Sequence, residues 1–250
     1  MERAGANGNG YAVIWDVDGV LIDSAEQHRL AWKQLAEENG FPYTDEAFWA
    51  GFGRRNSDVI PLMYGVSGPP RRVAALGARK EAIYRELLAR SAAPPLPGAV
   101  ALMAALHAAG YAQALGSSAP RENIALVVRL LGIAAYVGAL VSGEEVAHGK
   151  PAPDIFVTAA RKLGVAPPRC LVVEDAPAGV AAAHAGGMRA LAVRRAGVAD
   201  APGLERAEAL VTTLARADVA LVGRLLGRST TEGTEGTEGT EGTEGERRDY

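Results

Sequence analysis

Short apolar runs alternate with stretches of helical periodicity along most of the chain. Six apolar runs predict β-strands, at residues 12–17, 113–116, 139–141, 171–174, 190–193 and 209–211. Ala-rich stretches with helical spacing separate most of them, for example 99–109, 121–131 and 154–163. Alternation of this kind predicts an α/β fold built on a Rossmann-like parallel sheet.

Residues 24 to about 92 break this alternation, because they show helical patterns only. Ser24 begins one helix with a capping-box pattern through Gln27, and Gly40 can end that helix. A further helix is expected over about 72–90, and the Pro-rich stretch 92–99 returns the chain to the sheet.

A helical insertion directly after the first strand predicts a small α-helical cap over the strand ends. The alternative is a fixed helical subdomain. We therefore expect an α/β core formed by residues 1–22 and 93–228, with a cap formed by residues 23–92.

The chain ends in a repeat of Thr, Glu and Gly over residues 230–245, and it carries no apolar residue able to form a core. Residues 229–250 are therefore predicted to be a disordered tail. This tail holds seven acids and two arginines, so the net charge of −3 becomes about +2 for the remainder, with 22 acids against 24 Lys and Arg. A balance so close to zero is not that of a nucleic-acid-binding protein.

Cys170 is the one cysteine of the sequence, which excludes an internal disulfide and favours a reduced, cytoplasmic compartment. The first ten residues lack the apolar segment of a signal peptide, and no apolar run reaches the length of a membrane span. We expect a monomer with neither a membrane nor a nucleic-acid partner.

Polar residues gather at the ends of four predicted strands. They are Asp16 with Asp18, Ser117 with Ser118, Lys150, and Glu174 with Asp175. Each alone has an ordinary structural explanation, such as a helix cap or a solvated turn. Because ligand sites of parallel sheets lie at the carboxyl ends of the strands, the four clusters together predict one site. Its carboxylates suit a hard cation such as Mg²⁺, which retains waters that a phosphate can replace.

This setting indicates a role for each residue. Asp16 can attack phosphorus as a nucleophile, and Asp18 can serve the leaving or attacking oxygen as general acid and base. Ser117, with Ser118 beside it and a helix start following, can bind phosphate, and Lys150 adds a positive charge. Asp175 is the distal metal ligand, with Glu174 as the weaker candidate.

Four segments, "DVDGVLIDS", "LGSSAPREN", "GKPAPDIF" and "VVEDAPAGVAAAHAGGM", resemble in order and spacing the four motifs of the haloacid dehalogenase-like hydrolases. The helical insertion is similar to the cap of their phosphatase and β-phosphoglucomutase branch. The resemblance implies an aspartyl-phosphate on Asp16, and Mg²⁺ held by the carboxylates of Asp16 and Asp175 and the backbone carbonyl of Asp18. As a family, the dehalogenases lack the second of the two aspartates in the first motif. The presence of Asp18 therefore favours phosphoryl transfer.

The cap is expected to select the substrate, a small phosphorylated metabolite. The stretch around His28 resembles the first cap helix of the mutases, in which a histidine lies near the general acid. Phe52 and Asn56 replace two cations of the mutase pattern, and Arg54 and Arg55 could supply the charge instead. Hydrolysis of a sugar phosphate is therefore favoured over the isomerisation of a hexose phosphate. A different functional class, a non-catalytic interaction protein, is the remaining alternative.

Overall fold

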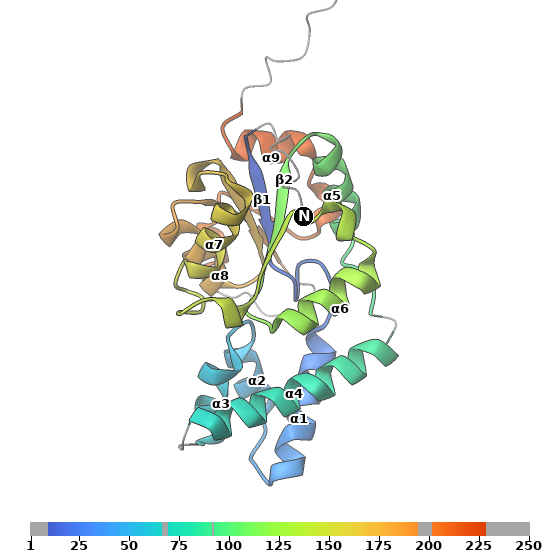
Figure 1. Ribbon diagram of the computed structural model, residues 1–250, viewed down its shortest axis with the longest axis vertical. Helices are drawn as coiled ribbons and strands as arrows, with labels where there is room; N and C mark the ends of the chain where they lie inside the picture. The colour runs from blue at the N-terminus through green and yellow to red at the C-terminus, as the bar shows by residue number, and fades with distance from the viewer. Residues whose placement is uncertain (1–9, 67–69, 92, 195–201, 229–250) are drawn as a thin grey trace, which may run out of the picture.

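A computed structural model describes residues 10–66, 70–91, 93–194 and 202–228 of the chain (Figure 1). Its centre is a six-stranded parallel sheet with the strand order β3-β2-β1-β4-β5-β6. The strands are β1 Ala12–Trp15, β2 Ala112–Gly116, β3 Ala139–Val141, β4 Cys170–Glu174, β5 Arg189–Val193 and β6 Ala209–Val211. All six predicted strands are present, and β1 ends two residues earlier than expected.

The helices of the described residues surround this sheet and extend beyond one end of it (Figure 1). They are α1 Ala25–Asn39, α2 Asp45–Gly51, α3 Asn56–Tyr64, α4 Pro70–Arg90, α5 Ala99–Ala108, α6 Arg121–Leu131, α7 Asp154–Leu163, α8 Pro177–Ala185 and α9 Val219–Leu225. Short 3₁₀ turns lie at Ala134–Tyr136, Gly143–Glu145, Pro167–Arg169, Leu204–Arg206 and Leu214–Arg216.

The central strand β1 is apolar at every position because both of its faces are buried. Val13 and Trp15 face a core shared with α5, α6 and α9, whereas Ala12 and Ile14 face a second core formed with α7 and α8. Both faces are covered by helices, so the alternation of a half-exposed strand is absent. The predicted class, an α/β fold with a Rossmann-like parallel sheet, is confirmed.

Helices α1 to α4, called the cap below, lie together beyond one end of the sheet (Figure 1). Helix α4 packs against both α1 and α3, and the apolar core of the cap is continuous with that of the sheet. Gly40 ends α1 in the left-handed conformation, with φ of 67°, as predicted. The boundary at 23–92 stays a prediction.

The predicted capping box at Ser24 is wrong. Ser24 precedes α1, but its side chain makes no cap hydrogen bond. The hydroxyl donates instead to Oδ1 of Asp18 at 2.5 Å. A residue that looked like a helix signal therefore belongs to the polar site at the end of β1.

The predicted tail at 229–250 and the first nine residues lie outside the described residues. Among the helices that are described, none has the length and apolar character needed to cross a membrane.

Candidate active site

Asp16 is the first residue beyond β1, at the carboxyl end of the central strand. Its backbone N–H donates to the carbonyl of Val173 at 3.0 Å, which continues the pairing with β4. The side chain is buried, and Nζ of Lys150 donates to its Oδ1 at 2.6 Å. The same ammonium contacts Glu174, so Lys150 joins two of the four predicted clusters.

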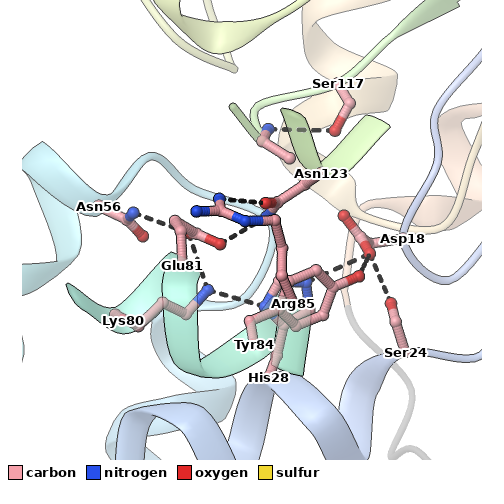
Figure 2. A network of polar contacts seen from close by, with 11 residues as sticks. Asp18, Ser24, His28, Asn56, Lys80, Glu81, Tyr84, Arg85, Ser117 and Asn123 are labelled. Atoms are coloured by element: carbon pink, nitrogen blue, oxygen red, sulfur yellow. Dashed lines mark hydrogen bonds and ion pairs between the residues drawn. The ribbon is translucent and has the colours of Figure 1, made fainter. Parts of the chain in front are cut away.

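Asp18 faces a different set of partners because the chain turns after it. Gly19 adopts φ of 84°, a conformation that favours glycine, and its N–H donates to the carbonyl of Ile22 at 2.9 Å. The Asp18 carboxylate turns toward the cap (Figure 2). Its Oδ1 accepts from Tyr84 at 3.1 Å and lies 3.2 Å from Nε2 of His28. The two aspartates therefore have separate partners.

Three buried carboxylates form a candidate metal site. Asp16, Glu174 and Asp175 each place one oxygen atom so that these atoms lie within 4.8 Å of one another. Burial raises the pKa of Asp16 well above its ordinary value, and Glu174 and Asp175 raise it further, against the lowering effect of Lys150. A divalent cation would offset this crowding, so the donor set fits a hard cation such as Mg²⁺.

Glu174 is bonded through both of its carboxylate oxygens. Its Oε2 accepts from the backbone N–H of Asp175 at 2.8 Å and of Ala176 at 2.7 Å, and its Oε1 contacts Lys150. Gly179 packs so closely against it that any side chain there would overlap the carboxylate. Glu174 therefore fixes Lys150 and the loop after β4, and fewer of its lone pairs remain for a metal. The Asp18 carboxylate is not part of this group.

Charge stabilises the ionised forms of Asp18 and Lys150. Burial alone would raise the pKa of Asp18, but His28, Ser24 and Lys80 lower it below its ordinary value. Burial alone would lower the pKa of Lys150, but Asp16 and Glu174 raise it. At neutral pH the site holds an ionised Asp18, able to accept a proton, and a charged Lys150.

Ser117 and Ser118 follow β2 and line the same pocket as Asp16 and Asp18. Oγ of Ser117 accepts from the backbone N–H of Ala119 at 3.1 Å, before α6 begins at Arg121. Oγ of Ser118 is buried and forms no hydrogen bond within the described part of the chain. These hydroxyls suit the binding of phosphoryl oxygens.

The predicted cap residues have different environments. His28 lies against Asp18, and Arg54 is exposed at the rim of the pocket. Arg55 is bonded elsewhere, since its Nη1 donates to the carbonyl of Ala147 at 3.1 Å. That contact joins the cap to the core rather than placing a cation in the pocket.

Sequence reasoning missed a chain of buried polar residues behind His28 (Figure 2). Nζ of Lys80 lies 2.8 Å from Nδ1 of His28 and 3.0 Å from Oε1 of Glu81. Glu81 accepts in turn from Asn56 of α3 and Asn123 of α6. One signal was available, because Lys80 interrupts the buried stripe of α4 that includes Leu76, Tyr84 and Leu88.

The catalytic pocket, as we call this cleft, lies between the core and the cap. Core residues Asp16, Asp18, Ser117 and Ser118 form one side of it. The cap closes the other side with His28, Trp32, Phe52, Arg54, Asn56, Lys80 and Glu81.

Comparison with known proteins agrees with this arrangement. A family model described as haloacid dehalogenase-like hydrolase matches residues 12–187. The chain is 36% identical over 188 residues to the β-phosphoglucomutase of Bacillus subtilis strain 168, covering 73% of this chain and 82% of that protein. It is 32% identical over 182 residues to the fructose-1-phosphate phosphatase YqaB of Escherichia coli K12, covering 73% and 95%.

The fold of the chain also matches the folds of solved structures. A β-phosphoglucomutase from Clostridium difficile superimposes with a TM-score of 0.78 at 23% identity, over 87% of this chain and 97% of that one. The chain therefore belongs to the haloacid dehalogenase-like hydrolases and is an enzyme of that family. Phosphatases and a phosphoglucomutase are among its relatives.

Proposed function

We propose that the protein is a Mg²⁺-dependent phosphatase that hydrolyses small sugar phosphates through an aspartyl-phosphate on Asp16. The observation that carries this proposal is the junction at Lys150, which bonds to Asp16 beside the carboxylates of Glu174 and Asp175. A nucleophile, a cation and a group of carboxylates able to hold a metal thereby meet at the carboxyl end of the central strand. The full set of these residues argues against a non-catalytic interaction protein.

Asp16 and Asp175 would hold the metal, with the backbone carbonyl of Asp18. Bound Mg²⁺ would neutralise charge on the substrate phosphate and so make phosphorus accessible to a carboxylate. Ser117, Ser118 and Lys150 bind the phosphoryl oxygens and orient the ester bond opposite Asp16. Asp16 forms the new P–O bond as the bond to the leaving oxygen breaks.

Asp18 handles the protons of both steps. Asp18, which is ionised in the free site, takes up a proton when the substrate binds and delivers it to the leaving oxygen of the sugar. The carboxylate so formed then takes a proton from the water that attacks the aspartyl-phosphate, which restores the protonated form. The hydrogen bonds from Ser24 and Tyr84, with the contact to His28, hold its carboxylate toward the cap side of the pocket. The cap covers this region and limits the access of bulk water.

A second candidate is a mutase that interconverts β-glucose 1-phosphate and glucose 6-phosphate. The 36% identity to a β-phosphoglucomutase and the position of His28 favour it. A mutase must grip the phosphate that is not reacting, and Phe52 and Asn56 stand where the mutase pattern has cations. Arg55, which could replace one of them, is bonded to the core.

Two assays test the proposal. Purified protein should hydrolyse p-nitrophenyl phosphate with Mg²⁺ and lose that activity in EDTA. With β-glucose 1-phosphate and a trace of glucose 1,6-bisphosphate, it should release inorganic phosphate faster than it forms glucose 6-phosphate. Faster formation of glucose 6-phosphate would establish the mutase instead.

A further inference from the structure

Glu81 is a buried acid in the wall of the catalytic pocket, on the cap side. It lies on α4 directly after Lys80, and its exposed fraction is 4%. It also lines a second cleft, together with Asn56 and Ser118, that runs between the cap and α6. A substrate group that extends from Asp16 toward α6 therefore passes close to this carboxylate.

Three neighbours fix the position of Glu81 (Figure 2). Its Oε1 accepts from Nδ2 of Asn56 at 2.7 Å and from Nζ of Lys80 at 3.0 Å. Its Oε2 accepts from Nδ2 of Asn123 at 2.5 Å. A carboxylate offers about four acceptor positions, so these three bonds leave room for one donor from a ligand.

Glu81 also affects the net charge on the cap side of the catalytic pocket. Burial alone would raise the pKa of Glu81, but Lys80, His28 and Asn56 lower it, so the side chain is ionised at neutral pH. Its charge offsets that of Lys80, whose ammonium is likewise buried. Arg54 is the other cation that lines the described part of the pocket, and it lies at the exposed rim. The second cleft also carries Arg55, Arg85 and Arg121, each of which is paired with an acid, namely Asp58, Glu122 and Glu145.

We propose that Glu81 is a specificity-determining residue, which makes the pocket select phosphomonoesters with an uncharged, hydroxyl-bearing leaving group and reject those carrying a second phosphate. This inference rests on the proposed phosphatase function and names its substrate class. A hydroxyl can donate to the remaining acceptor position of Glu81, whereas a second phosphate offers acceptors only. The dianion would also have to lose water beside a buried negative charge.

Fructose 1-phosphate and fructose 1,6-bisphosphate form a matched pair of probes, because they share the reacting phosphate and differ in the second one. The wild-type enzyme should have a kcat/KM roughly tenfold or more lower for the bisphosphate, given the size of charge interactions in a partly buried pocket. Glu81→Gln removes the negative charge, retains the shape and unmasks Lys80. It should raise the bisphosphate-to-monophosphate ratio of kcat/KM by about tenfold, mainly through a lower KM for the bisphosphate.

A purely structural role would lower kcat/KM for both sugars in parallel and leave their ratio unchanged. The control is Glu86→Gln, the same substitution at an exposed position of α4, which should leave the ratio at the wild-type value. An unchanged ratio in Glu81→Gln, or a wild-type enzyme that accepts both sugars equally, would overturn the proposal.

Ligand binding to the Asp16→Asn protein gives a second measurement, because this variant cannot turn either sugar over. Fructose 1-phosphate should raise its Tm at lower concentration than fructose 1,6-bisphosphate does, with Mg²⁺ present. Equal or stronger stabilisation by the bisphosphate would contradict the role of Glu81. Failure to hydrolyse p-nitrophenyl phosphate, by contrast, would contradict the phosphatase function. The comparison of binding between the two sugars would then still test the role of Glu81.

Discussion

His28 in the cap places its Nε2 atom 3.2 Å from Oδ1 of Asp18 in the core. The imidazole is held there by stacking on Tyr84, with ring centroids 3.9 Å apart and planes inclined by 10°. On its other side, Nδ1 lies 2.8 Å from Nζ of Lys80. The cap thus completes the surroundings of Asp18, the proposed general acid and base.

His28→Ala should slow the second step of hydrolysis more than the first. Removing His28 takes away a contact that holds the Asp18 carboxylate in place, so the carboxylate is no longer oriented toward the water that attacks the aspartyl-phosphate. The p-nitrophenolate anion leaves without a proton, and the first step is spared. Stopped-flow measurement with p-nitrophenyl phosphate should therefore show a burst approaching one product per enzyme, followed by a steady rate reduced roughly 10²-fold.

The matched control for that experiment is His107→Ala. His107 is exposed on α5, a helix that packs on the sheet and lies outside the cap. It should give the wild-type progress curve. A linear, unslowed curve from His28→Ala would show that the contact with Asp18 has no part in the reaction.

Mg²⁺ should raise the Tm of the wild-type protein, because it binds the carboxylates that crowd one another in the folded state. At about 100 times its Kd, a ligand of this kind adds about 2.7 kcal/mol, or a shift on the order of 5–10 °C for a chain of this size. Asp175→Asn should remove most of this shift in a thermal melt with and without Mg²⁺.

Asp58→Asn is the control, because Asp58 lies on α3 of the cap and outside the carboxylate group. It should keep the full Mg²⁺ response. A full response in Asp175→Asn would mean that the ion binds elsewhere.

Glu81 should stabilise the protein in a way that depends on pH. Its pKa in the folded protein is lowered from the ordinary 4.5, so its stabilising effect is present above that pH and is lost as the pH falls. The Tm of the wild type should exceed that of Glu81→Gln near neutral pH, and the difference should shrink as the pH falls below 4.5. A difference that stays constant over this range would show that ionised Glu81 does not hold the cap to α6.

The sequence was sufficient for the sheet and for the core side of the site. Each strand is a short apolar run, and the carboxyl ends of parallel strands meet, so Asp16, Lys150 and Asp175 could be brought together without coordinates. The turn at Gly19 was visible too. What could not be seen was that Asp18 turns away from Asp16, since that depends on donors from Ser24 and Tyr84.

The cap side was harder to predict, because its contacts join residues far apart in the chain. Glu81 bonds Asn56 and Asn123, which lie 25 and 42 positions away. No local pattern indicates such a pairing. Arg55 illustrates the same limit, since its position in the sequence favoured the pocket but the carbonyl of Ala147, 92 positions away, holds it.

The central claim is that Asp16 carries the phosphoryl group, and it can be tested by rapid acid quench during turnover of p-nitrophenyl phosphate with Mg²⁺. Peptide mass spectrometry should find one added phosphoryl group, on Asp16, in the wild-type protein. Asp16→Asn should show no such adduct and a turnover lower by orders of magnitude, with a Tm equal to or above that of the wild type. An adduct on another residue, or near-normal turnover by Asp16→Asn, would contradict the mechanism.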